Sequence, residues 1–163
     1  MPNQSNSKKK ITFVLPTFNE SKNIIPLLKQ ILKLETLYSL EIIIIDDNSS
    51  DGTSIIVDEF SEKFKQIILI NRFDRSGLSS AIKEGCLNAR GEIIAVMDTD
   101  GQHEVKTIKD GIEKLIANNK DLIIGSRFKK GSRIKGLSDK RKEGSSIANL
   151  LARISLSKSY SSI

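Results

Sequence analysis

Short apolar runs alternate with helical patterns between residues 11 and 125. Strands are predicted over 11–15, 41–45, 66–70, 92–97 and 121–125, and helices over 21–34, 53–64, 77–89 and 105–118. The strands are nearly unbroken runs of isoleucine, valine and leucine, which are typical of strands covered on both faces. The helices show apolar residues three and four positions apart. This alternation predicts an α/β fold with a mainly parallel sheet flanked by helices.

The two ends of the chain differ from this central region. Residues 1–10 are polar, so we expect a disordered lead-in. Residues 11–126 contain the whole alternating pattern and form the predicted α/β domain. Residues 127–163 begin with a stretch rich in glycine, lysine and arginine, for which we expect a loop, and continue with a predicted helix over 140–157.

The basic excess of the chain is concentrated in residues 127–163. The whole chain has a net charge of +6, whereas this segment has 10 lysines and arginines against Asp139 and Glu143. Such a segment favours an anionic partner, namely a nucleotide diphosphate, a lipid phosphate or a membrane surface. A solvated basic tail is the alternative. With 6 phenylalanines, 2 tyrosines and no tryptophan, the chain offers few rings for stacking bases, so no nucleic-acid partner is expected.

Cysteine use and hydropathy predict a cytoplasmic protein. The single cysteine, Cys86, can form no internal disulfide, which fits a reducing compartment. The polar first ten residues show no secretory signal, and no apolar run approaches the ~20 residues of a membrane-spanning helix. We therefore expect any contact with the cytoplasmic face of a membrane to be peripheral or through a partner subunit.

Aspartates follow two of the predicted strands. Asp46-Asp47 ends one strand, and Asp98-x-Asp100 follows another. The carboxyl ends of strands are where open α/β sheets bind ligands. If strand geometry continues through Asp100, Asp98 and Asp100 point to one face and suit a divalent cation bound with a diphosphate. A tight turn alone does not explain two adjacent carboxylates at the end of a buried strand.

Other polar residues near the predicted strand ends admit two interpretations. In the first loop, Asn19 or Ser21 could simply cap the following helix. His103, the only histidine, fits a base or a metal ligand as well as loop packing. Arg72 and Arg75 fit either a surface position or a phosphate contact.

Five short motifs, taken together, resemble a known family. They are Pro16-Thr17-Phe18-Asn19-Glu20, Asp46-Asp47-x-Ser49-x-Asp51-Gly52-Thr53, Gly77-Leu78-x-x-Ala81, Asp98-x-Asp100-x-Gln102-His103 and Gly125-Ser126-Arg127. In this order and spacing they are similar to the family 2 glycosyltransferases of the GT-A fold, and most of all to the dolichol-phosphate or polyprenyl-phosphate mannosyltransferases. The resemblance spans roughly residues 11–155. It implies a Rossmann-like GT-A fold, with nucleotide-sugar binding in 11–126 and the start of an acceptor-side region in 127–163.

The resemblance also assigns roles to individual residues. The nucleotide-sugar-binding residues would be Pro16, Phe18, Glu20, Ile45, Asp47, Asp98, Thr99 and Arg127. Ile45 and Asp47 would lie against the base and ribose. Asp100, with Gln102, would hold Mg²⁺ or Mn²⁺ between the two phosphates. Arg127 would face the diphosphate or the acceptor phosphate, so Asp100 and Arg127 are the expected catalytic residues.

The function implied by the resemblance is an inverting, metal-dependent transfer of mannose or glucose. The donor would be a GDP- or UDP-hexose, and the acceptor a polyprenyl or dolichyl phosphate. A hydroxyl acceptor needs a general base, and after Arg127 only Asp139 and Glu143 could serve. A phosphate monoester, with a second pKa of about 6, is largely ionised without one. The basic segment therefore favours the lipid phosphate over a sugar hydroxyl.

Departures from the family pattern keep alternatives open. Ser79 stands where a glycine is usual, and Glu104-Val105 replaces a usual proline. The family's catalytic domain also continues beyond the length of this chain, which leaves open a truncated, inactive relic that binds nucleotide only. A glycosyltransferase acting on a sugar hydroxyl is a second alternative.

Two other classes fit the motifs poorly. A sugar-1-phosphate nucleotidyltransferase would need a glycine-rich loop after the first strand. A phosphoacceptor signalling domain would need acids after the first strand and a single aspartate after the third. The first strand of this chain instead runs into Leu15-Pro16, and the third into Asn71-Arg72.

Overall fold

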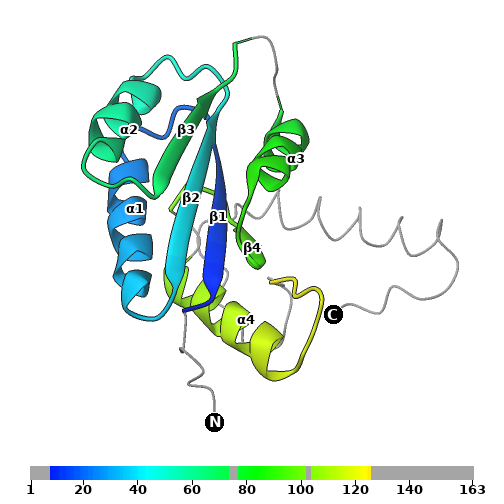
Figure 1. Ribbon diagram of the computed structural model, residues 1–163. Coiled ribbons are helices and arrows are strands. Elements are labelled where there is room, and N and C mark those ends of the chain that lie inside the picture. The colour runs from blue at the N-terminus through cyan, green and yellow to red at the C-terminus, as the bar shows by residue number, and fades with distance from the viewer. Residues whose placement is uncertain (1–7, 74–76, 102–103, 126–163) are drawn as a thin grey trace, which may run out of the picture. The chain divides into compact units, whose positions relative to one another are not determined.

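The computed structural model describes residues 8–73, 77–101 and 104–125. The chain divides into two compact units, residues 1–120 and 121–163. Within the described residues, the elements in chain order are β1 Lys10–Thr17, α1 Ile24–Leu32, the 3₁₀ helix η1 Lys33–Thr36, β2 Ser39–Asp46, α2 Thr53–Ser61, β3 Ile67–Asn71, α3 Leu78–Asn88, β4 Ile93–Val96 and α4 Val105–Ala117 (Figure 1). All of them belong to the first unit.

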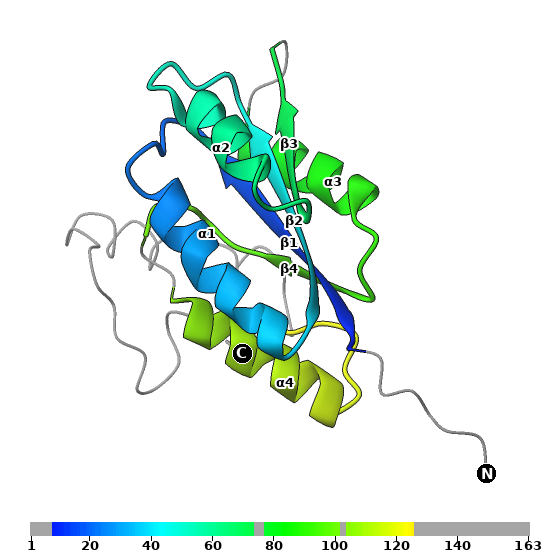
Figure 2. The same cartoon turned by 60° about the vertical axis from the view of Figure 1, so that its left-hand side comes forward.

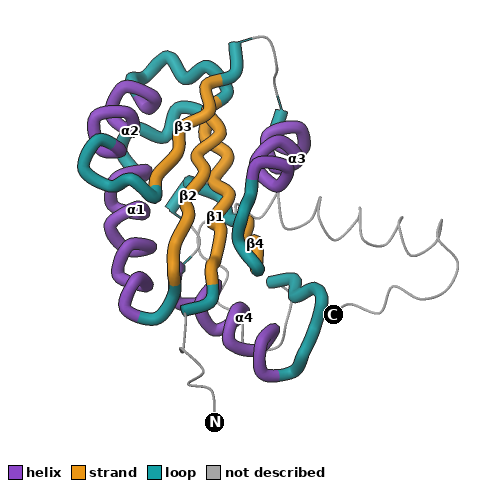
Figure 3. Tube along the Cα trace, viewed as in Figure 1, coloured by secondary structure: helices purple, strands orange, loops and turns teal. Residues whose placement is uncertain are grey.

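The sheet is parallel throughout, with the strand order β3-β2-β1-β4. The long central strands β1 and β2 pair from Lys10 with Ser39 to Thr17 with Asp46. Figure 3 shows the strands side by side, with β4 next to β1. From β1 the chain proceeds to β2 and β3 on one side, and then crosses to β4 on the other side. Such a reversal opens a crevice at the carboxyl ends of the strands, where α/β proteins bind ligands.

Helices cover both faces of the sheet, as the sequence predicts. The larger core contains side chains of α1, α2 and α4 packed on one face, and a smaller core under α3 covers the other (Figure 2). The smaller core contains Val14, Ile43, Ile45 and Ala81. Helix α3 approaches the sheet closely at Gly85. An added Cβ there would lie only 2.4 Å from Cγ1 of Val14.

One predicted strand is wrong. Residues 121–125 form no strand in the structure. Leu122 and Ile124 are 73% and 66% exposed. Strand propensity expresses how well a side chain fits a half-buried, pleated surface, and this segment has apolar side chains without such burial.

Several predictions concern residues outside the described ranges. These are most of the lead-in over 1–10 and the whole basic segment 127–163 with its loop and helix. Among the described residues, every helix is too short or too polar to cross a bilayer.

Candidate functional site

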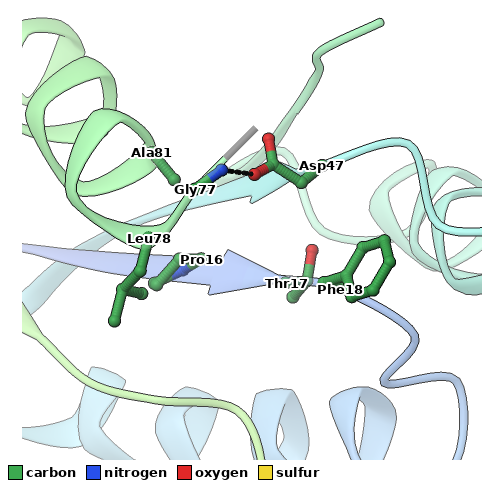
Figure 4. A pocket seen from close by; sticks show the side chains of 7 residues that line it. All are labelled: Pro16, Thr17, Phe18, Asp47, Gly77, Leu78 and Ala81. Carbon is green, nitrogen blue, oxygen red and sulfur yellow. Dashed lines mark hydrogen bonds between the residues drawn. The ribbon is translucent and has the colours of Figure 1, made fainter. Parts of the chain in front are cut away.

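A pocket of about 320 Å³ opens at the carboxyl ends of β1 and β2 and the beginning of α3. Its lining residues are Pro16, Thr17, Phe18, Asp47, Gly77, Leu78 and Ala81 (Figure 4). Most of these are apolar, and Phe18 is 63% exposed. Asp47 contributes the one carboxylate of the lining. Ligand pockets commonly combine an apolar wall with a few polar groups that fix the orientation of the ligand.

The two adjacent aspartates at the end of β2 have different surroundings. Asp46 is buried. Its carboxylate accepts hydrogen bonds from the hydroxyls of Thr17 (2.9 Å) and Ser49 (2.6 Å), and from the backbone N–H of Ser49 (2.8 Å). These bonds hold the end of β1 and the loop after β2 together. Asp46 is therefore a structural residue, which the sequence pattern did not distinguish from its neighbour.

Asp47 instead faces the pocket. Its Oδ2 accepts a hydrogen bond of 2.7 Å from the backbone N–H of Gly77, drawn in Figure 4. Its Oδ1 forms an ion pair with Arg72, which is only 4% exposed. The surface position considered for Arg72 is therefore wrong. The sequence feature that indicates a buried Arg72 is its position directly after a buried strand. The same feature distinguishes the aspartates.

The loops after β1 and β2 are tied together by hydrogen bonds. The Asn19 N–H donates to the Ser49 hydroxyl (2.8 Å), and the Ser50 N–H donates to the Asn19 side chain (2.9 Å). Asn19 has a φ of 57°, which asparagine tolerates better than most residues. It does not cap α1, which begins after Asn23 without a side-chain cap, and neither does Ser21. The predicted capping is wrong because these groups bond to the neighbouring loop.

Asp51 strengthens the same connection. Its carboxylate accepts hydrogen bonds from the hydroxyl and N–H of Thr53 and from the N–H of Ser21. The bond from the Thr53 hydroxyl is the main cause that holds the pKa of Asp51 far below its usual range. The Glu20 N–H donates to the Thr53 hydroxyl (2.9 Å). The loop after β2 therefore holds in place the loop after β1, which forms one wall of the pocket.

The segment after β4 lies beside this pocket. Thr99 is buried, and its hydroxyl donates a hydrogen bond of 3.1 Å to the carbonyl oxygen of Pro16. Asp98 is half-buried and Asp100 is exposed. The strand ends at Val96 and the chain bends from Thr99 onward. The condition for placing both acids on one strand face is therefore not met.

The oxygen donors of this segment fit a hard divalent cation. Asp98 and Asp100 offer carboxylates at the strand-end edge of the sheet, and Asp100 is open to solvent. Mg²⁺ is typically held by one or two carboxylates together with substrate phosphates. Three or more histidine, cysteine or acidic side chains do not gather anywhere in the described part of the chain. Asp98 and Asp100 therefore fit a metal that the phosphates of a bound ligand would also ligate.

The structure brings some of the predicted site residues together and not others. Pro16, Phe18 and Asp47 line the pocket, and Thr99 contacts Pro16. Ile45 is fully buried in the core under α3, and its predicted contact with the base stays a prediction. The side chain of Glu20 accepts a hydrogen bond from Asn23 (2.8 Å). Other predicted residues lie outside the described ranges, namely Arg75, Gln102, His103 and Arg127.

Four lining residues had no predicted role: Thr17, Gly77, Leu78 and Ala81. Gly77, Leu78 and Ala81 belong to one of the five motifs, so the motif itself was the signal. Gly77 has a φ of 110°, a conformation that only glycine adopts without strain. Thr17 lies between two residues that were predicted to line the pocket.

Known proteins match both the sequence and the fold. The model of glycosyl transferase family 2 matches residues 12–156. A dolichol-phosphate mannosyltransferase from Pyrococcus furiosus is 36% identical over 149 residues, which are 91% of this chain and 42% of that protein. A dolichyl-phosphate beta-glucosyltransferase from Trichomonas vaginalis is 30% identical over 128 residues, 72% of this chain and 39% of that protein. The chain thus spans about two fifths of the length of these curated relatives.

Solved structures share the fold. The mannosyltransferase PcManGT from Pyrobaculum calidifontis, in complex with GDP-Man and Mn²⁺, gives a TM-score of 0.57 at 24% identity, over 71% of this chain and 34% of that one. TarS from S. aureus, in complex with UDP, gives 0.56 at 24% identity, over 77% and 43%. The predicted GT-A fold is confirmed. Together with the matched residues 12–156, this shows that the chain belongs to glycosyl transferase family 2.

Proposed function

We propose that this chain is the donor-binding part of a glycosyltransferase that moves a hexose from a nucleotide-diphosphate sugar to a polyprenyl phosphate. The observation that carries the proposal is the position of Asp47 and Asp100. One lies in an apolar pocket and the other follows β4, at the edge where the strand order reverses. The names of the relatives, a dolichol-phosphate mannosyltransferase and a dolichyl-phosphate beta-glucosyltransferase, support the substrate class.

The pocket suits the base and ribose of the donor. The exposed ring of Phe18 and the apolar side chains of Pro16, Leu78 and Ala81 provide a surface against which a flat base can pack. The Asp47 carboxylate can accept hydrogen bonds from base N–H groups or ribose hydroxyls. GDP and UDP both offer such donors, so this site accommodates either.

The diphosphate would lie toward the segment after β4. Asp98 and Thr99 would flank the ribose and diphosphate, and the bond from Thr99 to Pro16 fixes this segment against the pocket. Mg²⁺ or Mn²⁺, held by Asp100 and Gln102, would neutralise the charge that develops on the departing diphosphate. Arg127 would add a second positive group there. An acceptor attacking from the side opposite the diphosphate would invert the anomeric carbon.

The acceptor would be a lipid phosphate at the cytoplasmic face of a membrane. Residues 127–163 carry 10 basic and 2 acidic residues. Basic clusters are attracted to anionic lipid surfaces and to phosphate groups. A phosphate nucleophile is already ionised near neutral pH, so the reaction needs no general base on the acceptor side.

A transfer assay with radiolabelled GDP-mannose and UDP-glucose tests the proposal. We expect label to pass to polyprenyl phosphate in the presence of Mn²⁺ or Mg²⁺, and to be lost in Asp100→Asn but not in Asp58→Asn, a change at an exposed residue of α2. Donor binding without transfer would indicate a nucleotide-binding relic. Transfer to a free sugar instead of the lipid phosphate would indicate a hydroxyl acceptor, and either result would contradict the proposal.

A further inference from the structure

Arg72 is a buried cation next to the pocket but is not part of its lining. Its side chain is 2% exposed. Its Nη1 donates a hydrogen bond to the Ser80 hydroxyl (2.8 Å), and its Nη2 donates to the carbonyl oxygen of Gly77 (3.2 Å). The guanidinium forms an ion pair with Asp47, and Nη1 lies 3.7 Å from a carboxylate oxygen of Glu84. One side chain therefore contacts both the loop after β2 and the first two turns of α3.

Stability alone is a weak explanation for a buried charge in this position. Removing ions from water is costly, and well-packed apolar residues often stabilise a core as well as a buried ion pair does or better. The Nε atom of Arg72 has no hydrogen-bond partner among the described residues. Its contacts are concentrated on the two Nη atoms, which hold Asp47 and Gly77. Both of those residues line the pocket.

The geometry makes Arg72 the link between three segments that shape the pocket. Its backbone N–H donates to the carbonyl oxygen of Asp46 (2.9 Å), which continues the pairing of β3 with β2. Its side chain then holds Asp47 from one side, while the Gly77 N–H holds the other oxygen of that carboxylate. Gly77 has a φ of 110° and is the residue at which the chain turns into α3. Asp47 is thus held by an ion pair with Arg72 at one oxygen and by a hydrogen bond from the Gly77 N–H at the other.

We propose that Arg72 is a positioning residue for nucleotide binding. It fixes the Asp47 carboxylate and the Gly77 backbone in the arrangement that receives the base and ribose. The inference rests on the proposed function, because it assigns Arg72 to the donor site. Rigid groups that are already in place lose less conformational entropy when a ligand binds, so loosening Asp47 weakens binding even in a folded protein.

The test is Arg72→Lys, with Arg90→Lys as the matched control at an exposed position. Lysine keeps the charge but lacks the planar fork that contacts several acceptors at once. Calorimetry with GDP and UDP in Mn²⁺, well below the Tm of each variant, measures the Kd. We expect about tenfold weaker binding in Arg72→Lys and no change in Arg90→Lys.

A double-mutant cycle separates positioning from general loss of stability. If Arg72 acts through Asp47, Arg72→Lys weakens binding in the natural sequence but adds nothing in an Asp47→Asn background. A lower Tm with an unchanged Kd would show a purely structural role and overturn the inference. Equal losses in both backgrounds would overturn it as well.

Two further measurements cover the remaining outcomes. If Arg72→Lys does not fold, Ser80→Ala removes one acceptor of Nη1, and its exposed neighbour Ser79→Ala is the control. We expect about threefold weaker binding in Ser80→Ala only, and equal Kd values would overturn the inference. If the natural protein binds no nucleotide, the proposed function fails. In that case, hydrogen exchange of the Gly77 amide tests whether Arg72 holds the Gly77 backbone in place. Faster exchange in Arg72→Lys supports this role, and unchanged exchange contradicts it.

Discussion

Neighbouring residues of the same type serve different purposes at the end of β2. Asp46 is buried and accepts hydrogen bonds from Thr17 and Ser49, whereas Asp47 faces the pocket and pairs with Arg72. The sequence predicts that carboxylates gather at strand ends, because the apolar run stops there. It does not predict which aspartate is buried and which faces the pocket, since that depends on hydrogen-bond donors far away in the chain. For the same reason the partner of Arg72 could not be predicted.

The structural role of Asp46 predicts the effect of Asp46→Asn. An amide has one oxygen, so one of the donors on Ser49 then faces an NH₂ group inside the protein. We expect the free energy of unfolding to fall by about 1–3 kcal/mol, as measured by urea denaturation. Asp58→Asn, on the exposed face of α2, is expected to stay within about 0.5 kcal/mol of the natural protein. Equal stability of the two variants would contradict the role given to Asp46.

The helices and strands follow the apolar pattern closely where they pack on one another. Helix α1 was predicted over 21–34, and the structure has α1 at Ile24–Leu32 followed by a 3₁₀ turn. Pro26 is the third residue of α1, where its missing N–H needs no helical partner. The failure over 121–125 shows the limit of this method. A short apolar run does not reveal whether a neighbouring strand is available to it.

The close packing of α3 predicts the effect of Gly85→Ala. The added Cβ would lie 2.4 Å from Cγ1 of Val14 and 2.6 Å from Cδ1 of Ile45, so either α3 or these core side chains must shift. We expect a loss of about 1–3 kcal/mol in the free energy of unfolding, measured by thermal or urea denaturation. Gly111→Ala in α4 meets nothing within 4 Å and should be neutral or stabilising by up to about 1 kcal/mol. The reverse order of stability would show that α3 is not so tightly placed.

A buried carboxylate at the opposite end of the sheet predicts a pH dependence. Burial alone would raise the pKa of Glu41, but hydrogen bonds from the Thr12 hydroxyl and the Arg90 N–H, with Lys10 nearby, lower it overall. A lowered folded-state pKa gives stability that is present above the unfolded value of about 4.5 and is lost as the pH falls through the folded value.

Urea denaturation between pH 7 and pH 3 measures this contribution. The natural protein is expected to lose stability below pH ~4.5, with a shallower slope in Glu41→Gln. Asp51, whose pKa is also lowered, accounts for part of the slope that remains. Identical slopes in the two proteins would contradict the connection that Glu41 makes between β1, β2 and the chain before β4.

At the scale of the whole molecule, the order β3-β2-β1-β4 explains where the site lies. It brings Asp47, after β2, and the segment containing Asp100, after β4, to one edge of the sheet on either side of β1. The alternating pattern predicts a parallel sheet but not the order of its strands. The motifs add the expectation of a common site at this edge, because they resemble those of family 2 glycosyltransferases.

The central claim is that this edge of the sheet binds a nucleotide diphosphate together with a divalent cation. Calorimetry of GDP-mannose and UDP-glucose, with and without Mn²⁺, tests it most directly in the natural protein, Asp100→Asn and Asp58→Asn. We expect saturable binding that Mn²⁺ strengthens in the natural protein and in Asp58→Asn, and weak, metal-independent binding in Asp100→Asn. No saturable binding in the natural protein, or an equal effect of Mn²⁺ in all three proteins, would contradict the claim.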